Sequence, residues 1–148
     1  MFTGGSEHVL DAKGRTSIPA KFRDVLSGCA DDRLVLSMDL QGQCLEVRPY
    51  EDWNELLERV RALPVTHPAR RHFERVVVGQ AEILTTDKQG RILVPPALRE
   101  KVGLDKAVYF VGQIDRFQIW DSAAWQKALA ESERFGADNP DAFADLGI

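Results

Sequence analysis

The sequence predicts a mainly β, α+β fold in which two tandem copies of one unit share a pseudo-symmetric β-barrel. The first observation is a repeat: residues 11–23 align with residues 87–99 without a gap, at a constant offset of 76. The second is that similar apolar segments follow both copies in the same order. The third is size, because a unit of roughly 60 residues buries only a marginal core by itself. A shared core would stabilise both copies.

The repeated segment preserves residues that shape turns and begin helices. The identical aligned pairs are Asp11/Asp87, Gly14/Gly90, Arg15/Arg91, Pro19/Pro95 and Arg23/Arg99. The glycine supplies the positive φ that a short hairpin loop requires, and the aspartate can accept hydrogen bonds from backbone N–H groups of the loop. Proline suits the first position of a helix, where no N–H is needed. Each copy therefore predicts a strand, a tight turn, a second strand and a short helix.

The later part of each copy is also alike. The short helix is expected to end at a glycine, Gly28 or Gly103. Two apolar strands follow in each copy, over 34–36 and 44–47 in the first and over 108–111 and 116–119 in the second. Each copy then enters a longer helix with a tryptophan, Trp53 or Trp125. Because each tryptophan sits on an apolar helical stripe, we expect a core or interface anchor rather than a platform for base stacking.

The chain divides into four stretches on this basis. They are the first unit with its C-terminal helix over residues 1–63, a helical connector over 64–78, the second unit with its C-terminal helix over 79–134, and an acidic tail over 135–148. Pro64 should end the first long helix, and Pro68 should begin the connector helix. The polar composition from Glu131 onward predicts a mobile or loosely docked tail.

The charge of the chain is unevenly distributed. Its 148 residues include 19 Lys and Arg against 23 Asp and Glu, which gives a net charge of −4 at pH 7. The residues from Asp121 onward contain six acids and two bases, so residues 1–120 are neutral in sum. The repeated segments are basic, with a net charge of +3 over residues 11–23 and +2 over residues 87–101. A nucleic-acid partner must therefore be judged from local patches rather than from the whole chain.

The arginines of the two turns are the strongest candidates for a binding function. Arg15 and Arg91 follow the glycine of each turn, where a guanidinium can bind phosphate oxygens or the O6 and N7 atoms of guanine in the major groove. Two-stranded ribbons fit that groove, and nearby lysines would contact phosphates. The residues expected to contact double-stranded DNA are Lys13, Gly14, Arg15, Lys88, Gly90 and Arg91, with Asp11 and Asp87 shaping the loops.

An alternative for the turn arginines is purely structural. Arg15 could do no more than pair with Asp11 across its own turn, which is a common surface arrangement of small energetic value. For one copy this alternative would be the better interpretation. The presence of the same arrangement in both copies favours a function.

Other basic residues suit a structural role as readily as a functional one. Arg23 and Arg99 lie four residues beyond the prolines, where either a semi-buried pairing near the helix end or a phosphate contact fits. The cluster of Arg70, Arg71 and Arg75 is more typical of a solvated or interface helix face than of a nucleic-acid site.

The signatures of an enzyme in the sequence are weak. His8, His67 and His72 lack the spacing of metal ligands, and no Walker loop, Gly-x-Ser-x-Gly or dinucleotide motif occurs. Asp11 and Asp87 could form a carboxylate pair, but nothing gives them the unequal environments that acid and base roles require. We therefore expect no catalytic residue, no metal or other cofactor and no small-molecule substrate.

The sequence also predicts a cytoplasmic location. No apolar run approaches the roughly 20 residues of a membrane-spanning helix, and the N-terminus lacks the features of a signal peptide. Cys29 and Cys44 are too few for a disulfide scaffold, so both thiols are expected to be small packing residues in a reducing compartment.

The duplicated motif resembles the MraZ family. The features that match are Asp-x-x-Gly-Arg followed by an apolar residue and proline, twice in one chain, with further likeness at Phe2-x-Gly4, 7–15, Arg70-Arg71, 79–81, Gly112-Gln113 and 117–120. The likeness runs from Met1 to about Leu129. It implies a fold of the AbrB/SpoVT-like class, a double-split or swapped-hairpin β-barrel built from two tandem repeats.

The resemblance also implies a function. It is that of a nucleoid-associated transcriptional regulator, usually a repressor, acting on the promoter of the division and cell-wall gene cluster that contains its own gene. Such proteins bind closely spaced direct repeats in DNA and assemble as closed rings of identical subunits. The loops that read DNA in the family correspond here to residues 11–15 and 87–91. The second loop departs from the first, because Gln89 stands where the first has Lys13.

Two alternatives belong to other functional classes. The first is an antitoxin-like module that binds a partner protein through its tail, although such a module normally has one hairpin unit and a long disordered C-terminal segment. The second is an enzyme on a related barrel, which an ordered ligand or metal between Asp11 and Asp87 would support.

Overall fold

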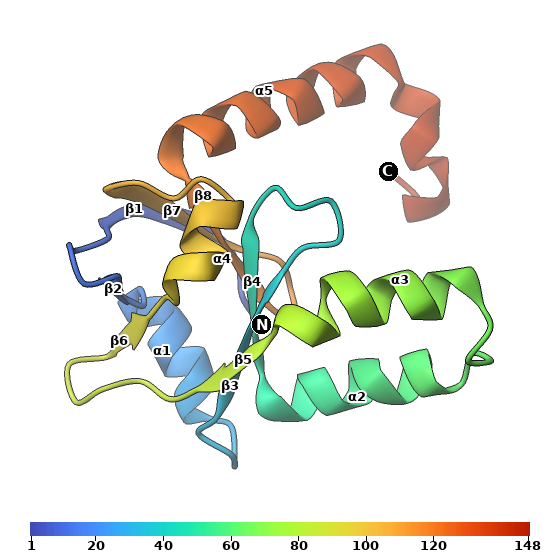
Figure 1. Cartoon of the computed structure of the whole chain (residues 1–148). Helices are drawn as coiled ribbons and strands as arrows, with labels where there is room; N and C mark the ends of the chain where they lie inside the picture. Colours follow the sequence, from blue (N-terminus) through green and yellow to red (C-terminus); the bar gives the residue numbers. More distant parts are fainter.

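The computed structural model describes residues 1–148 and has a mixed α+β architecture (Figure 1). The first half contains β1 (Gly5–Val9), β2 (Arg15–Ser17), α1 (Ala20–Ser27), β3 (Leu34–Met38), β4 (Leu45–Pro49) and α2 (Tyr50–Arg61). The connector contains α3 (Pro68–Val76) and the 3-10 helix η1 (Val78–Gln80). The second half contains β5 (Glu82–Leu84), β6 (Arg91–Leu93), α4 (Pro96–Lys101), β7 (Ala107–Gly112), β8 (Phe117–Asp121), α5 (Ser122–Asp138) and the 3-10 helix η2 (Pro140–Leu146). The predicted α+β class and order of elements are confirmed.

The two halves exchange their first hairpins. The six-stranded sheet has the order β1-β7-β8-β4-β3-β5, so β1 pairs with β7 of the second half and β5 pairs with β3 of the first. A separate two-stranded sheet joins β2 to β6. This interleaving is the swapped-hairpin arrangement that the resemblance implies. Because β1 and β5 are the edges of the larger sheet, no continuous ladder of hydrogen bonds closes the barrel.

One hydrophobic core serves both halves. Its fully buried side chains include Ile18 and Phe22 from the first half and Phe110 and Phe117 from the second. The rings of Phe22 and Phe117 stack with their centroids 5.0 Å apart, so aromatic contacts bridge the halves directly. Neither half therefore completes its apolar packing without the other.

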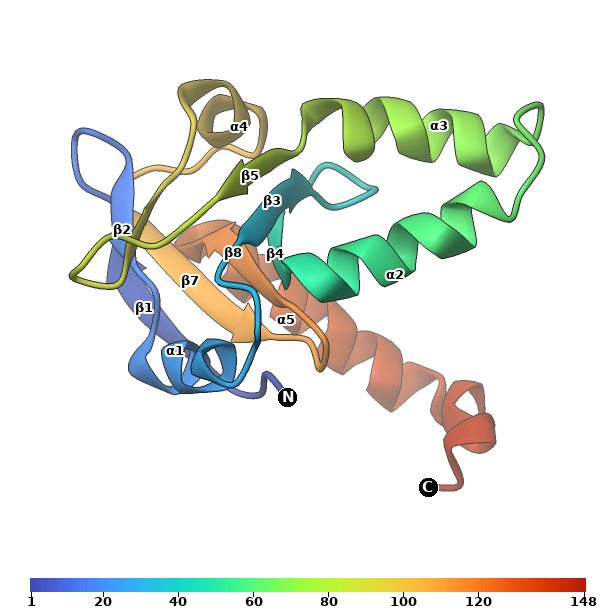
Figure 2. The ribbon, with the colours of Figure 1, turned by 90° about the horizontal axis from the view of Figure 1, so that it is seen from below.

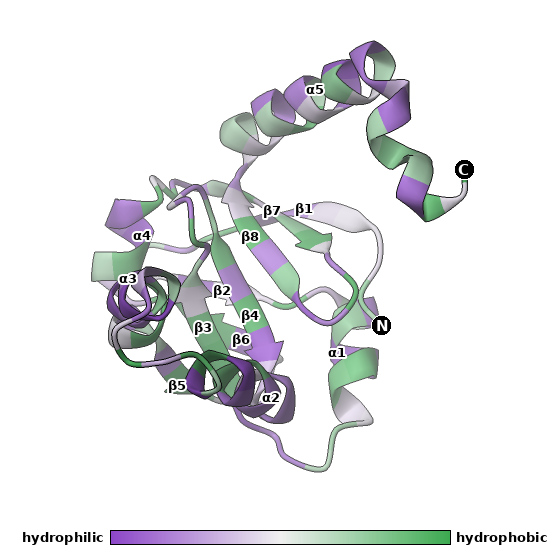
Figure 3. Ribbon diagram, turned by 90° about the vertical axis from the view of Figure 1, so that its right-hand side faces the viewer, coloured by the Kyte–Doolittle hydropathy of each residue, from purple (hydrophilic) through white to green (hydrophobic).

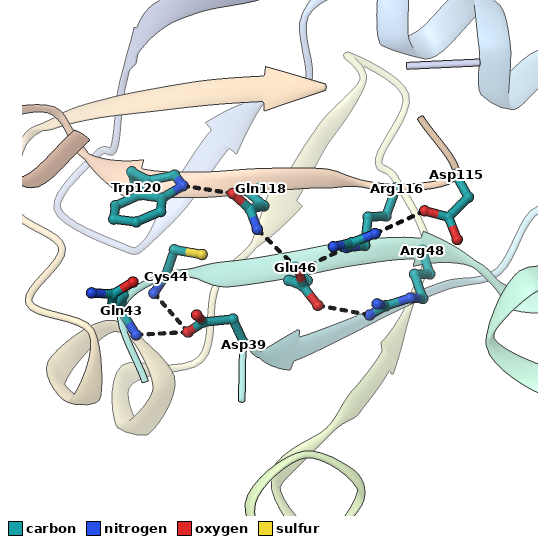
Figure 4. A network of polar contacts seen from close by, with 9 residues as sticks. All are labelled: Asp39, Gln43, Cys44, Glu46, Arg48, Asp115, Arg116, Gln118 and Trp120. Atoms are coloured by element: carbon teal, nitrogen blue, oxygen red, sulfur yellow. Dashed lines mark hydrogen bonds and ion pairs between the residues drawn. The ribbon is translucent and has the colours of Figure 1, made fainter. Parts of the chain in front are cut away.

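A buried polar network joins the halves where β4 pairs with β8 (Figure 4). The carboxylate of Glu46 on β4 accepts hydrogen bonds from Arg116 Nε at 2.7 Å and from Gln118 Nε2 at 3.0 Å. Arg48 Nη1 lies 3.0 Å from its other oxygen. Burial raises the pKa of Glu46, but the hydrogen bond from Arg116 and the charge of Arg48 outweigh that effect and leave the pKa below its ordinary value.

The tryptophans have the anchoring role that the sequence predicts. Trp53 of α2 is buried and packs with Val35 of β3 and Val77 at the end of the connector. Trp125 of α5 stacks on Tyr109 of β7, with ring centroids 5.3 Å apart. Each longer helix is therefore fixed to the sheet by its tryptophan.

Several local details differ from the expectations. Pro19 and Pro95 stand one position earlier than predicted, as the residues that precede α1 and α4. The residue after α1, Gly28, has an ordinary negative φ of −81°, whereas Gly103 has the expected positive φ of 67°.

The C-terminal region is more regular than its composition suggested. Helix α5 continues past residue 134 to Asp138 because residues 122–138 contain no proline, and η2 follows. None of the helices in the chain is both long and apolar enough to cross a membrane.

Candidate nucleic-acid interface

The loop between β1 and β2, residues 11–15, is called tip 1 here, and its shape is set by Asp11. One oxygen of that carboxylate, Oδ1, accepts the backbone N–H groups of Lys13 at 2.9 Å and of Arg15 at 2.8 Å. The other oxygen, Oδ2, accepts the Nε–H of Arg15 at 2.8 Å. Gly14 closes the turn with a φ of 88° and donates its N–H to the carbonyl of Asp11 at 3.0 Å. Asp11 therefore accepts two backbone N–H groups and one side-chain N–H from its own loop.

The loop between β5 and β6, residues 87–91, is called tip 2 and has the same geometry. Asp87 Oδ1 accepts the N–H groups of Gln89 and Arg91, both at 2.9 Å, and Asp87 Oδ2 accepts the Nε–H of Arg91 at 2.8 Å. Gly90 has a φ of 75°. The aspartate, glycine and arginine that are identical at an offset of 76 therefore form the same hydrogen bonds in both loops, as expected when neighbouring residues determine the turn.

Each arginine is held by its aspartate but is not hidden by it. The side chains of Arg15 and Arg91 are 36% and 30% exposed. The ion pair uses only Nε, so both terminal nitrogens of Arg15 are without a protein partner, and Arg91 Nη2 makes one long contact of 3.4 Å with Gln89. Each arginine therefore pairs with its aspartate and still has part of its guanidinium available to bind a ligand.

The two aspartates are firmly ionised. The N–H of Arg15 and its guanidinium hold the pKa of Asp11 below its ordinary value of 3.8. The N–H and guanidinium of Arg91 lower the pKa of Asp87 in the same way. The ion pair between aspartate and arginine in each tip, called the brace here, therefore persists at neutral pH.

The two-stranded sheet orients the arginines on one surface. Its register pairs Arg15 with Leu93, Thr16 with Ile92 and Ser17 with Arg91. Side chains alternate along a strand, so the buried Thr16 and Ile92 face the core and both arginines face outward. The tips project from the same end of the molecule, away from the α2–α3 hairpin, as Figures 1 and 2 show.

Contacts between the halves hold each tip from behind. The carbonyl of Gly14 accepts the N–H of Val94 at 2.8 Å, and the carbonyl of Gly90 accepts the N–H of Ile18 at 3.0 Å. Arg23 of the first half also packs against tip 2, where a Cβ added to Gly90 would lie 2.6 Å from Arg23 Cδ.

This support explains why Arg23 and Arg99 recur in the repeat. The sequence is compatible with either a pairing near a helix end or a phosphate contact for these two arginines. The observed position is at the tip of the opposite half. In the sequence, only the identity of these two arginines at an offset of 76 indicated a shared role. That role became clear from the exchange of the hairpins, which brings each arginine to the tip of the other half.

The remaining basic candidates occupy two different regions. Lys13 and Lys88 are exposed beside the tip arginines. Arg70 lies on α3, where Nε is 2.6 Å from the carboxylate of Glu74 and Nη1 donates to the carbonyl of Leu63 at 2.8 Å. The structure therefore gathers the predicted DNA-contacting residues at the tips and places Arg70 in contacts within α3 and with the loop that follows α2.

Comparison with known proteins identifies the chain's relatives. The family model described as "MraZ protein, putative antitoxin-like" matches residues 1–76 and again residues 77–146. A protein from Acidithiobacillus ferrooxidans named "Transcriptional regulator MraZ" is 46% identical over 99% of this chain and 97% of its own length. Proteins of the same name from Shewanella pealeana and Pseudomonas putida are 39% and 38% identical, covering 89% and 98% of this chain and 87% and 95% of their own lengths.

The two matches divide the chain near the end of the connector, at residues 76 and 77. They confirm the tandem repeat and the resemblance that the turn motifs indicated. With both halves matched and relatives of this identity along nearly the whole length, the chain belongs to the MraZ family.

Proposed function

We propose that this protein is a transcriptional regulator that binds double-stranded DNA through its two hairpin tips. The observation that carries the proposal is the duplicated brace, in which Asp11 and Asp87 bind the Nε of Arg15 and Arg91 while the two arginine side chains stay 36% and 30% exposed. A guanidinium held in this way keeps two parallel donors for guanine O6 and N7 or for phosphate, and loses little side-chain entropy on binding. The names of the relatives support the regulatory role.

The neighbouring residues suit a supporting role in the same interface. Lys13 and Lys88 add positive charge beside each arginine, which favours phosphate contacts without specifying sequence. Gly14 and Gly90 are themselves buried, and their lack of a side chain lets each tip pack closely against the arginine of the opposite half. The shared outward face of β2 and β6 presents both tips to one groove, as a two-stranded ribbon can.

The negative charge of the chain is compatible with this proposal because of where it lies. Most of the excess acid follows Asp121, in α5 and η2, which extend away from the tips in Figures 1 and 2. Charges separated by more than the Debye length, about 8 Å at physiological ionic strength, are largely screened. The tips therefore meet DNA as a local basic surface.

The family resemblance supports a finer proposal. We infer a cytoplasmic, nucleoid-associated repressor of the promoter of the division and cell-wall gene cluster that includes its own gene. Subunits related by rotation in a closed ring would present successive tips in the same direction, which suits direct repeats in DNA better than palindromes.

The direct test is removal of each tip arginine. Arg15→Ala and Arg91→Ala are expected to weaken binding to the upstream region of the protein's own operon by roughly ten- to a hundredfold and to lower the salt dependence by about one ion per contact. Arg61→Ala, which removes an exposed arginine from α2, is the matched control. Fluorescence anisotropy over a salt series measures both quantities. Unchanged affinity and salt slope in both tip variants would exclude the proposal.

A second candidate function is favoured by the family description, which includes the words "antitoxin-like". In that case the chain would bind a small partner protein, and the tips would serve another purpose. This candidate would be supported by stable co-purification with a small toxin, together with an affinity for DNA that is unchanged in Arg15→Ala and Arg91→Ala.

A further inference from the structure

The two-stranded sheet of β2 and β6 has an approximate two-fold symmetry. Its three cross-strand pairs are Arg15 with Leu93, Thr16 with Ile92, and Ser17 with Arg91. The repeat offset of 76 exchanges the first pair with the last and leaves the central pair in place. Because the central pair is buried, the other four side chains share the outward surface, which is called the ribbon face here. The approximate two-fold axis of the ribbon face passes through the central pair.

The symmetry of the ribbon face is broken at one pair of equivalent positions. Leu93 and Ser17 occupy the same place in the two repeats but differ in chemistry. Arg15 therefore has a leucine as its cross-strand neighbour, whereas Arg91 has a serine. The Cβ atoms of directly opposed residues in antiparallel strands lie about 4.5–5.5 Å apart. Each arginine and its neighbour can thus contact the same stretch of a bound duplex, and the two ends of the ribbon face offer that duplex different groups.

The apolar side chain of Leu93 is not used by the core. It is 56% exposed, whereas the adjacent Ile92 and Val94 are 1% and 0% exposed. Leu93 also belongs to none of the three hydrophobic clusters of the chain. The fold therefore leaves this side chain on the surface beside Arg15, where it is available to a ligand.

A leucine beside an arginine suits one particular combination of bases. In the major groove, the C5 methyl group of thymine is the group that apolar side chains contact, and the O6 and N7 atoms of guanine are the acceptors that arginine binds. Leu93 and Arg15 together therefore match a thymine next to a guanine. At the other end of the ribbon face, the hydroxyl of Ser17 can either donate or accept a hydrogen bond, so it is less selective among bases.

The two loops differ in the same sense as the two ends of the ribbon face. Gln89 Oε1 of tip 2 lies 3.4 Å from Arg91 Nη2, whereas tip 1 has Lys13 at the equivalent position and leaves both terminal nitrogens of Arg15 without a protein partner. The acidic C-terminal region does not oppose either end, since α5 and the C-terminus extend away from the sheets in Figure 3. The end that contains Arg15 is thus the better donor for a guanine and carries the apolar neighbour.

We propose that Leu93 is a specificity-determining residue of the DNA interface, which packs on the C5 methyl group of a thymine beside the guanine that Arg15 binds. The inference rests on the proposed function and deepens it, because it assigns one end of the interface to a particular pair of bases. The end with Arg91 and Ser17 lacks this contact. The ribbon face therefore distinguishes the two directions along a duplex, although an approximate two-fold axis relates its arginines.

The test compares thymine with deoxyuridine, which differs from it only in lacking the C5 methyl group. A duplex from the upstream region of the protein's own operon is prepared in versions that carry deoxyuridine in place of each thymine in turn. For the wild-type chain, replacement at one position of the bound site should weaken binding about fourfold, because one methyl group leaves an apolar contact. Fluorescence anisotropy at fixed salt measures the affinities.

Variants of the full-length chain assign this effect to one side chain. Leu93→Ser makes the two ends of the ribbon face alike, so it should bind the thymine duplex about fourfold more weakly and no longer distinguish it from the deoxyuridine duplex. Leu93→Met keeps an apolar side chain and should keep the distinction. Ile83→Ser is the matched control, because Ile83 of β5 is also apolar and 56% exposed but lies outside the ribbon face. Circular dichroism confirms that each variant is folded.

The proposal is overturned if the wild-type chain is insensitive to the loss of every thymine methyl group, or if Leu93→Ser keeps the wild-type sensitivity. It is also overturned if Ile83→Ser loses that sensitivity. Arg15→Ala and Arg91→Ala separate this inference from the proposed function. If both weaken binding while no thymine methyl group matters, the inference alone fails. If neither weakens binding, the proposed function fails and this inference fails with it.

Discussion

Arg99 of the second repeat packs against Gly14 of the first. A Cβ added to Gly14 would lie 2.8 Å from Arg99 Cζ and 2.9 Å from the carbonyl oxygen of Val94. Tip 1 is therefore built by its own turn residues and held from behind by the other half of the chain. Arg23 of the first half does the same for tip 2, so each tip is supported by the opposite half of the chain.

Replacing Gly14 tests this close approach. Gly14→Ala is expected to destabilise the fold by about 2 kcal/mol and to weaken DNA binding, because the new methyl group combines a strained positive φ with a contact against the Val94 backbone. Gly42→Ala is the matched control, since Gly42 also has a positive φ, of 72°, but has open space around its Cβ. That variant should lose about 1 kcal/mol and keep its affinity. Equal losses in urea unfolding and in binding would contradict the role assigned to this contact.

Asp11→Asn tests whether the brace orients Arg15. An asparagine oxygen can still accept the backbone N–H groups of the loop, but the ion pair with the guanidinium is lost. The expected result is a folded protein with a several-fold weaker affinity for DNA. Asp31→Asn removes a similar aspartate–arginine pair, with Arg33, outside the tips and should leave affinity unchanged. A parallel loss in both variants would show a general charge effect instead.

Thr16→Val should stabilise the protein. Thr16 is buried opposite Ile92, and its hydroxyl has no hydrogen-bond partner. An isosteric valine removes the unpaired group without opening a cavity, which predicts a gain of about 1 kcal/mol in the free energy of unfolding. Thr66→Val, at an exposed position between α2 and α3, should have no comparable effect. A loss of stability in Thr16→Val would mean that the hydroxyl has a partner.

Glu46 should make stability depend on pH in the acid range. Its pKa in the folded protein lies below the ordinary 4.5, so it stabilises the fold above pH 4.5, and this contribution is lost as pH falls through the lower folded pKa. Glu46→Gln should cost on the order of 2 kcal/mol at pH 7 and flatten the stability profile between pH 5 and 3. Glu58→Gln, in an exposed pair with Arg61, is the control. Denaturant unfolding at each pH measures the profile, and an unflattened curve for Glu46→Gln would contradict the prediction.

The sequence determined the features that depend on neighbouring residues. Asp11, Gly14 and Arg15 lie within five positions, so turn chemistry alone predicted the shape of tip 1 and, by repetition, of tip 2. The alternation of strands and helices followed from local patterns for the same reason. Helix α5 ran past its expected end because polar composition was a poor guide where helix-compatible residues continue to Asp138.

Only the tertiary structure decided which strands pair and what lies behind the tips. The pairing of β1 with β7, the packing of Arg99 on Gly14 and the hydrogen bond from Arg116 to Glu46 join residues 70 or more positions apart. No local propensity distinguishes two equivalent hairpins that stay in their own halves from two that exchange. The exchange is selected because burying Phe22 against Phe117 in one common core removes more apolar surface from water than two small separate cores could.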